Sequence, residues 1–410
     1  MVENKRLLKS LVINKDFLKA KAPVGIVERD FFCSLPRDRY DFTVYCSDER
    51  PQADCPFAHV NRVKDVNILK LIPGIAVRMG FPDLYNVPDR SAYSWAWKVR
   101  KEIRKNLRTD NFDYIHSISF PNTCHTIALQ LKKETGLPWI AQFYDPWVGS
   151  AFLGFKTKFF KDRYEDLERQ VAENADVIIH DNDLIVEDWT RRYGENIRRK
   201  IVVLPIVFDP SQNAKSKTVD RKIGEGLVLS HIGNLYKGRN SFSFIEAASM
   251  LLQKHPDCRN KLKVNYIGNI GQDEKEKITN CGLSDIFNLA GYLSQEECIP
   301  YYKSTDIFLS IDSGNVGGEL CFPSKILKYF YFQKPILGIT PEQSVLTNEL
   351  KKSGHIAIKN NDIEGIVTYL ERAIDDYDSL MNFNMDYYGR FLPEIVVEQY
   401  NDIVDKLLEH

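Results

Sequence analysis

The chain has 410 residues, more than one hydrophobic core usually organises, so we expect two domains of roughly 200 residues each. A formal net charge of −1 excludes a global field that would attract nucleic acid or an anionic membrane, so any anion site has to be local. No apolar run reaches the ~18 residues of a membrane-spanning helix, and the eight cysteines contain no C-x-x-C pair. Because Lys9 and Asn14 interrupt the apolar stretch near the N-terminus, no secretory signal is predicted. We therefore expect a cytoplasmic protein without a metal site and without nucleic acid as a partner.

Short runs rich in Val, Ile and Tyr alternate with helical patterns in the first half of the chain. Strands are predicted at 11–14, 42–46, 114–117, 139–143, 177–180 and 201–204. Helical periodicity lies between them, for example at 127–133 and 164–174. Strands separated by helices predict βαβ units and a parallel sheet.

The stretch 92–108 carries Tyr93, Trp95 and Trp97 beside several lysines and arginines. Two interpretations are open. The stretch is either a basic helix that lies on an anionic bilayer surface or an amphipathic surface helix with its aromatic side chains in the core. We favour the second because such helices are common.

A polar, lysine-rich stretch at 209–225 has no periodic signal and is predicted to be a linker. Strand patterns restart beyond it at 227–232, 264–267, 286–289, 307–311, 336–339 and 355–358, and an amphipathic helix is predicted at 393–408. The sequence thus predicts an α/β protein with two parallel-sheet domains, 1–208 and 209–389. Their strand ends are expected to face a central ligand cleft.

Several motifs of common enzymes are missing. The chain has no G-x-G-x-x-G after a strand, no G-x-x-x-x-G-K-[ST], no H-E-x-x-H and no G-x-S-x-G. Hydride transfer, nucleoside-triphosphate hydrolysis, zinc proteolysis and serine hydrolysis therefore lose their usual support in the sequence.

One candidate anion site is the segment 231–240, His-Ile-Gly-Asn-Leu-Tyr-Lys-Gly-Arg-Asn, between a predicted strand and a helix at 242–252. Gly233 and Gly238 allow the backbone to turn tightly, and Arg239 supplies a fixed cation at the helix entrance. A guanidinium beside free helix N–H groups suits a diphosphate. The alternative is an ordinary turn with a solvated arginine, but a cation bracketed by glycines after a strand is what anion sites need.

A second candidate is the segment 312–325, Asp-Ser-Gly-Asn-Val-Gly-Gly-Glu-Leu-Cys-Phe-Pro-Ser-Lys. Lys325 lies near the positive end of a proline-started helix, and Glu319 can accept hydrogen bonds from ribose or sugar hydroxyls. Arg239 and Lys325, from separate loops, would together neutralise a diphosphate leaving group. Taken alone, this segment is also compatible with a plain glycine-rich loop before a helix.

These segments resemble the GT-B glycosyltransferases of family 4. The resemblance lies in His-Ile-Gly-x-x-Tyr-x-Gly-Arg-Asn, in Phe-Pro-Ser-Lys-Ile-Leu-Lys-Tyr-(x)4-Lys-Pro-Ile-Leu-Gly, and in Gly-Tyr-Leu-Ser-Gln-Glu-Glu at 291–297. In the first domain, Phe-Tyr-Asp-Pro-Trp at 143–147 and Ala-Asp-Val-Ile at 175–178 are similar to segments of the same family. The resemblance spans nearly the whole chain and is stronger in the second domain.

The resemblance implies a GT-B fold of two Rossmann-like domains, with the helix at 390–410 packed back on the first domain. It implies that the second domain binds a nucleotide sugar, with Arg239 and Lys325 on the diphosphate and Glu319 on ribose or sugar. The donor-binding residues implied are Gly25, Gly233, Asn234, Gly238, Arg239, Gly318, Glu319, Ser324 and Lys325. Gly25 ends an early loop, 19–25, expected near the donor phosphates, although its lysines can equally be solvated.

The first domain is expected to hold the acceptor. Asp145 would hold a sugar hydroxyl or assist the acceptor, and its alternative role is that of a turn or helix-capping aspartate. His116 ends a strand where relatives carry a histidine that touches the donor sugar, and its alternative is a packed strand-end histidine. One departure is Lys328, which stands where many relatives carry a second glutamate. Another is 204–209, which lacks the family's Asn-Gly.

The resemblance further implies a hexosyltransferase that needs neither a metal nor a cofactor and retains anomeric configuration. Its acceptor would be a saccharide or a lipid-linked saccharide in bacterial-type surface polysaccharide synthesis, with peripheral contact at the inner membrane face. Two other hypotheses stay open, a nucleotide-sugar 2-epimerase of similar fold and a non-catalytic sugar-nucleotide binder.

Overall fold

The computed structural model describes residues 6–19, 23–48, 58–64, 93–107, 111–149, 158–208, 226–235, 238–312 and 317–409. The chain divides into two compact units. Unit 1 comprises Met1–Phe208 and Phe391–His410, and unit 2 comprises Asp209–Arg390. The linker predicted at 209–225 lies outside the described residues.

The described part of unit 1 contains a seven-stranded parallel sheet with the strand order β3-β2-β1-β4-β5-β6-β7. The strands are β1 (Leu8–Ile13), β2 (Tyr40–Ser47), β3 (Ala58–Val63), β4 (Tyr114–Ile118), β5 (Trp139–Gln142), β6 (Val177–His180) and β7 (Ile201–Val203). Every residue of β4 and β5 is buried, which explains why these strands read as apolar runs rather than alternating ones. The edge strand β3 was not predicted because half of its six residues are polar.

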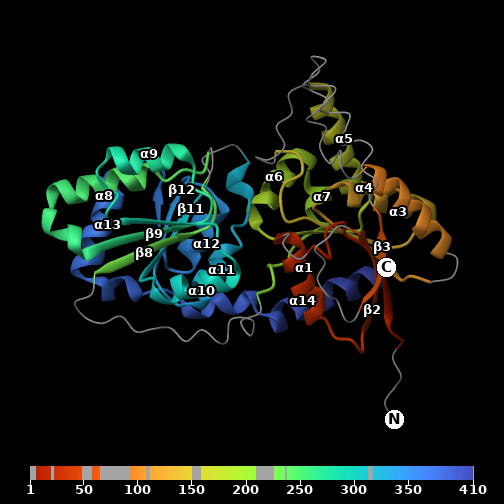
Figure 1. The fold of residues 1–410 in the computed structure, drawn as a ribbon. Coiled ribbons are helices and arrows are strands. Elements are labelled where there is room, and N and C mark those ends of the chain that lie inside the picture. The colour runs from red at the N-terminus through yellow and green to blue at the C-terminus, as the bar shows by residue number, and fades with distance from the viewer. Residues whose placement is uncertain are drawn as a thin grey trace, which may run out of the picture. The chain divides into compact units, whose positions relative to one another are not determined.

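Helices cover both faces of this sheet. They are α1 (Pro23–Ser34), α3 (Tyr93–Asn106), α4 (Thr123–Thr135), α5 (Lys158–Asn174), α6 (Asp183–Tyr193), α7 (Glu195–Arg198) and α14 (Pro393–Leu408). α1 and α14 lie together on one face (Figure 1), where the ring of Phe31 meets Tyr400 at 5.0 Å and Phe32 meets Phe42 at 4.9 Å. The last helix of the chain is therefore part of the core of unit 1.

The described part of unit 2 contains a six-stranded parallel sheet with the order β10-β9-β8-β11-β12-β13. The strands are β8 (Leu227–Ile232), β9 (Leu262–Ile267), β10 (Phe287–Gly291), β11 (Ile307–Ile311), β12 (Ile336–Thr340) and β13 (Ile356–Lys359). The helices are α8 (Phe242–Lys254), α9 (Gln272–Asn280), α10 (Gln295–Ser304), α11 (Lys325–Tyr331), α12 (Val345–Lys352) and α13 (Ile363–Asp375), with 3-10 turns η5 (Pro256–Lys261), η6 (Gly318–Leu320), η7 (Tyr377–Met381) and η8 (Met385–Phe391).

Local signals in the sequence begin and end several of these helices. A capping box of Ser294 and Glu297 begins α10, because each side chain binds a backbone N–H of the other residue. The side chains of Asn182 and Ser344 cap α6 and α12 by accepting a backbone N–H of the first turn. Gly136 ends α4 in the left-handed conformation, with φ 73°.

Each sheet reverses its strand order at one point, between β1 and β4 in unit 1 and between β8 and β11 in unit 2. Ligands of open parallel sheets bind outside the carboxyl ends of the strands at such a switch point. The structure confirms the predicted fold class of two parallel-sheet α/β units. It also gives each unit a defined place to look for a site.

Candidate functional site

A glycine lies directly at the switch point of unit 2. Gly233 follows β8 with φ 152°, a conformation that favours glycine. A Cβ built at this residue would lie 3.5 Å from Lys325 Nζ and 3.6 Å from His231 Nε2. The absent side chain therefore leaves the backbone open to the Lys325 ammonium and to the imidazole.

Arg239 reaches the same place from the loop before α8. Its Nη2 lies 3.4 Å from Oδ1 of Asp312, the residue that follows β11. The Asp312 side chain is 2% exposed, whereas the Arg239 side chain is 21% exposed and so still reaches solvent. A buried carboxylate thus holds the guanidinium at the end of the switch-point strands, beside Lys325.

The charge of Arg239 affects the pKa of Lys325. Burial and, to a smaller extent, the charge of Arg239 lower the pKa of Lys325 to about 7, while Asp312 acts in the opposite direction. Because part of Lys325 is still exposed, a bound anion can restore its charge. Arg239 and Lys325, predicted from separate loops, are therefore brought to one site.

His231 is a neutral member of this site. Its Nδ1 lies 3.1 Å from the carbonyl oxygen of Leu309, and within the described ranges its Nε2 has no hydrogen-bond partner. Burial lowers the pKa of His231 well below its usual value, and Lys325 and Arg239 lower it as well. With Nδ1 donating to the carbonyl, Nε2 is an acceptor that faces Gly233 and the ammonium.

Gly318, Glu319, Gly238 and Asn234 were also predicted to bind the donor. Gly318 and Glu319 belong to the turn η6, where Glu319 is half-buried, and Gly238 has φ 91° immediately before Arg239. Asn234, by contrast, holds a neighbouring loop, since its Oδ1 accepts the backbone N–H of Asn269 at 2.9 Å. In the described part of the chain, no hydrogen bond or ion pair links Gly318, Glu319 or Asn234 to Lys325. That these three residues contact a donor therefore stays a prediction.

Ser324 is exposed and precedes α11 without a side-chain capping bond. Lys328, which replaces the family's second glutamate, points toward α10. Its Nζ lies 3.5 Å from Gln295 Oε1 and 6.0 Å from the ring centre of Tyr302. The structure thus gives Lys328 a packing partner on α10.

Asp145 lies in the turn after β5, at the carboxyl edge of the unit 1 sheet, and is half-buried. It is preceded by Tyr144, whose hydroxyl accepts a 2.8 Å hydrogen bond from Gln142 Nε2. Two residues after it comes Trp147, which is 1% exposed. A polar carboxylate therefore sits on a turn whose flanking side chains are fixed in the core.

His116 lies in the predicted strand but inside the core, and Gly25 does not lie on the predicted loop. His116 is fully buried in β4, with Nε2 2.8 Å from Gln142 Oε1 and Nδ1 3.0 Å from Tyr400 Oη. Its ring nitrogens are used inside the core, so the structure favours the packed strand histidine over a contact with the donor sugar. Gly25 lies in the first turn of α1 rather than on a loop, and a Cβ there would come within 2.4 Å of Asp16 O. Residues 20–22 of the predicted loop are outside the described ranges.

Comparison with known proteins agrees with this architecture. Residues 29–212 match the model of Glycosyltransferase Family 4. Over nearly the whole chain, sucrose-phosphate synthase from Thermosynechococcus elongatus has a similar structure, with a TM-score of 0.66 at 11% identity, covering 98% of this chain and 99% of that one.

This chain has the fold of the GT-B glycosyltransferases.

Two further structures share the fold. Anabaena HepE, in complex with UDP-glucose, has a TM-score of 0.64 at 12% identity and covers 97% of this chain and 100% of its own. A structure from E. coli, described as trehalose-6-phosphate bound with UDP-2-fluoro glucose, has a TM-score of 0.61 at 12% identity and covers 98% and 99%. No curated protein matches this chain in sequence.

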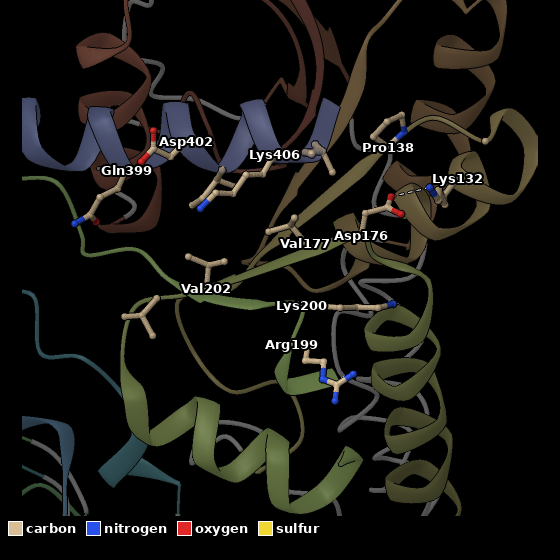
Figure 2. Close-up of a pocket in the computed structure, with 14 residues that line it drawn as sticks. Lys132, Pro138, Asp176, Val177, Arg199, Lys200, Val202, Gln399, Asp402 and Lys406 are labelled. Carbon is tan, nitrogen blue, oxygen red and sulfur yellow. Dashed lines mark hydrogen bonds and ion pairs between the residues drawn. The ribbon is translucent and has the colours of Figure 1, made fainter. Parts of the chain in front are cut away.

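Unit 1 also has a large groove, of about 760 Å3, between α14 and the edge strand β7 (Figure 2). It lies at the amino ends of β5 and β6, opposite the edge at which the switch-point site of a parallel sheet forms. Its two half-buried lysines are already engaged. Lys132 binds Asp176 at 2.7 Å, and Lys200 donates to the carbonyls of Glu173 and Ala175 at 2.7 and 3.0 Å. Size alone therefore does not make this groove the site of sugar transfer.

Two residues of the candidate site in unit 2 were not predicted as site residues, His231 and Asp312. Each lies at the end of a strand beside the switch point, and that position is the only signal that would have found them. No helix in the described part of the chain is long and apolar enough to cross a membrane. Nor do three His, Cys, Asp or Glu side chains come together there as a metal site requires.

Proposed function

We propose that unit 2 binds a nucleoside-diphosphate sugar and that Arg239 and Lys325 neutralise its diphosphate. The observation that carries this proposal is that Lys325 lies beside Gly233 at the switch point while Arg239, held by Asp312, is close enough to affect the charge of Lys325. A guanidinium and an ammonium from different loops can each face one phosphate group, and the glycine lets the diphosphate approach the backbone.

The chemistry depends on the leaving group. The bond between the anomeric carbon and the terminal phosphate oxygen breaks, and negative charge grows on that oxygen while the acceptor hydroxyl forms the new glycosidic bond and loses its proton. Arg239 and Lys325 stabilise the growing charge without a metal or cofactor. Asp312 holds the guanidinium, and the His231 Nε2 acceptor lies beside Gly233, where it can accept a hydrogen bond from the ligand.

Unit 1 supplies the acceptor side in this proposal. Asp145 holds an acceptor hydroxyl or takes up its proton, and the acceptor is a saccharide or a lipid-linked saccharide in surface polysaccharide synthesis, with retention of configuration. The family match over residues 29–212 supports sugar transfer in general. The complexes of the similar structures with UDP-glucose and UDP-2-fluoro glucose support a nucleotide sugar as the donor class.

We also propose that α3 gives unit 1 a peripheral contact with an anionic membrane surface. Trp95 is buried, as a core aromatic should be, but Trp97 is 60% exposed and Lys101 Nζ lies 5.6 Å from its ring centre. An exposed tryptophan beside basic side chains suits the headgroup region. The favoured interpretation of this helix, with its aromatic side chains in the core, is therefore wrong for Trp97.

The test is a calorimetric titration of the whole chain with UDP, GDP, ADP, TDP and the matching monophosphates. One diphosphate is expected to bind at least about tenfold more tightly than its monophosphate, because the second phosphate meets the second cation. Lys325→Ala and Arg239→Ala should each remove that difference. Equal binding of the mono- and diphosphate to the wild-type protein, or unchanged diphosphate affinity in both variants, would overturn the proposal.

A further inference from the structure

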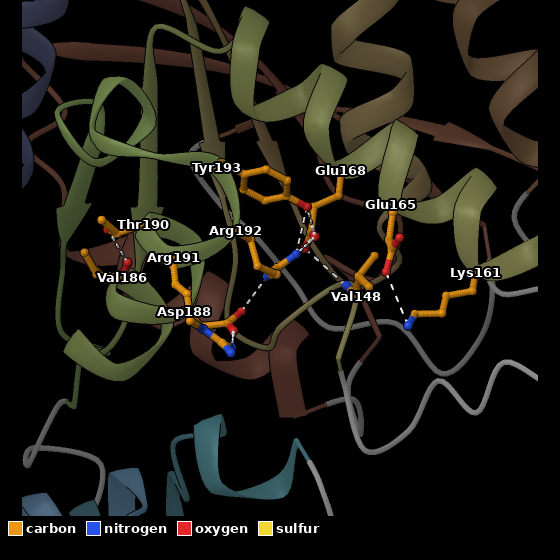
Figure 3. A network of polar contacts seen from close by, with 10 residues as sticks. All are labelled: Val148, Lys161, Glu165, Glu168, Val186, Asp188, Thr190, Arg191, Arg192 and Tyr193. Atoms are coloured by element: carbon orange, nitrogen blue, oxygen red, sulfur yellow. Dashed lines mark hydrogen bonds and ion pairs between the residues drawn. The ribbon is translucent and has the colours of Figure 1, made fainter. Parts of the chain in front are cut away.

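A buried polar network in unit 1 holds the turn that carries Asp145 (Figure 3). Its centre is Glu168, in the middle of α5, whose side chain is fully buried. Glu168 Oε1 accepts a 3.1 Å hydrogen bond from the backbone N–H of Val148, three residues after Asp145. Its Oε2 accepts hydrogen bonds from the Tyr193 hydroxyl at 2.5 Å and from the Arg192 guanidinium. One carboxylate therefore joins α5 and α6 to the turn.

The guanidinium of this network is itself fixed. Arg192 Nε donates to Asp188 Oδ2 at 2.8 Å, and the ring centre of Tyr193 lies 4.8 Å from the guanidinium carbon. Burial acts to lower the pKa of Arg192, but Glu168, Tyr193 and Asp188 together raise it, so the side chain stays charged. A buried ion pair contributes little net stability compared with apolar side chains of the same volume. The hydrogen bond that holds the turn at Val148 therefore explains a buried glutamate at position 168 better than stability alone does.

The other flank of the turn is fixed as well. The Tyr144 hydroxyl accepts a hydrogen bond from Gln142, and the buried ring of Trp147 meets Tyr164 of α5 edge-on at 6.2 Å. Asp145 lies between these anchored residues and keeps part of its surface exposed. Because both sides are anchored, the backbone that carries Asp145 is held at the end of β5.

We propose that Glu168 is a positioning residue for sugar transfer, which acts through Val148 on the turn at 145–148. The inference rests on the proposed function, because it gives Asp145 its role at the acceptor. Displacing a reacting group by about 1 Å costs on the order of 10²-fold in rate. A carboxylate that fixes the turn thus affects the reaction without touching the substrate.

Two double variants separate the anchor from the ion pair. Glu168→Gln/Arg192→Met removes both charges but keeps an amide oxygen for the Val148 N–H, and Asp188 stays paired with Arg191 at 2.5 Å. Glu168→Met/Arg192→Met removes the acceptor as well. We expect kcat of the second variant to be at least about tenfold below that of the first, with the KM for the donor unchanged. Amide hydrogen exchange at 143–148 should be faster in the second variant only.

A network of the same residue types in unit 2 provides the control. The Tyr387 hydroxyl donates to Glu349 Oε2 at 2.9 Å, and Arg390 Nη1 lies 3.8 Å from Glu349 Oε1. Glu349→Met/Arg390→Met is expected to lower Tm and leave kcat unchanged. If Glu168→Met/Arg192→Met does not fold, Glu168→Asp, which keeps the charge but withdraws the carboxylate by one methylene, replaces it in the comparison.

The inference is overturned if the unit 1 variants lose no more kcat than the unit 2 control at the same loss of Tm. It is also overturned if Asp145→Asn transfers sugar at the wild-type rate while the Glu168 variants do not. Failure of the proposed function has a different signature, namely nucleoside diphosphate binding that ignores Arg239 and Lys325. Amide hydrogen exchange at residues 143–148 is measured independently of nucleoside diphosphate binding.

Discussion

His116 and His231 are two buried histidines on strands that flank the switch points of two sheets of one type. Burial lowers the pKa of both, to about 4 for His116, so both are neutral. In unit 1, Gln142 and Tyr400 occupy both ring nitrogens. In unit 2, Nε2 is left facing Gly233 and an ammonium group.

The difference arises from the residues just beyond the strand ends. In unit 2 a glycine comes directly after β8, so no Cβ covers the strand end and charged side chains from two loops reach it. In unit 1, β4 runs into Ser119, which is fully buried, and the neighbouring β5 runs into Phe143, which is 1% exposed. The same topology thus gives an open candidate anion site in one unit and a closed neutral network in the other, and substitutions in the two units can test that contrast.

The largest effect is expected for Arg239→Ala. The substitution removes the fixed positive charge that stabilises the diphosphate leaving group. It should lower kcat/KM on the order of 10²–10³-fold, because the attraction between the arginine and the leaving group strengthens in the transition state. Release of nucleoside diphosphate from the nucleotide sugar, with a cell-envelope extract as acceptor, measures it. Arg259→Ala is the matched control, since Arg259 binds Asp285 with two hydrogen bonds on the surface of the same unit. An equal loss in both variants would show that unit 2 has no special cation at Arg239.

The histidine pair gives the next largest effect. His231→Asn keeps a donor for the Leu309 carbonyl but loses the Nε2 acceptor, so nucleoside diphosphate affinity should fall about tenfold, or ~1.4 kcal/mol. His116→Asn should lower the unfolding free energy by about 2 kcal/mol, since it breaks buried hydrogen bonds, and leave that affinity unchanged. Calorimetry measures the nucleoside diphosphate affinity of both variants, and chemical denaturation measures their unfolding free energies. The contrast between the units fails if the two histidines change the same property.

A pH dependence is expected from Lys325, whose pKa in the folded protein is lowered to about 7. The unfolded chain then binds more protons than the folded one between about pH 7 and the ordinary lysine pKa of 10.5, so unfolding free energy should rise with pH in that window. Diphosphate binding changes in the opposite sense. It should weaken above pH 7 by up to about tenfold per pH unit as the ammonium loses its proton, and proton uptake on binding should be measurable at about pH 8.

Lys325→Arg tests the origin of this pH dependence. An arginine keeps its charge over the whole range, so the diphosphate affinity of the variant should be flat from about pH 6 to about pH 9. A wild-type profile that is equally flat would remove Lys325 as the titrating group.

The smallest effect concerns the surface of unit 1. Trp97→Ala should change the unfolding free energy by no more than about 0.5 kcal/mol, because the side chain is mostly exposed. It should nevertheless lower co-sedimentation with vesicles of phosphatidylglycerol a few-fold, and added salt should lower it further. Tyr292→Ala, at a 70% exposed aromatic of unit 2, is the control. The same loss in the control would mean that the membrane contact is not specific to α3.

Most of the fold could be predicted from the sequence because the strands are buried on both faces. Short apolar runs such as Ile307–Ile311 and Val177–His180 match their strands residue for residue. The edge strand Ala58–Val63 escaped because an edge tolerates polar residues, which removes the apolar pattern. Tertiary pairing, not local periodicity, makes it a strand.

The site could be predicted only where the chemistry is local. Arg239 and Lys325 stand out because each is a cation between glycine or proline and the start of a helix. Asp312 and His231 did not stand out, because their meaning depends on the pairing of β8 with β11, two strands far apart in the chain. The two interpretations of His116 could not be separated from the sequence, since the direction of a strand-end side chain depends on packing partners such as Tyr400, far away in the sequence.

The 2.8 Å hydrogen bond from the Phe208 N–H to the Phe391 carbonyl joins the two points at which the chain leaves unit 1 and returns to it. Unit 2 is therefore an insertion within unit 1, and the helix α14 that completes the first core is synthesised after unit 2. On the ribosome, all of unit 2 emerges before unit 1 can bury its exposed sheet face. A nascent chain that stalls just before Phe391 would hold a finished second unit and an unfinished first one, which would be the part that chaperones and proteases recognise.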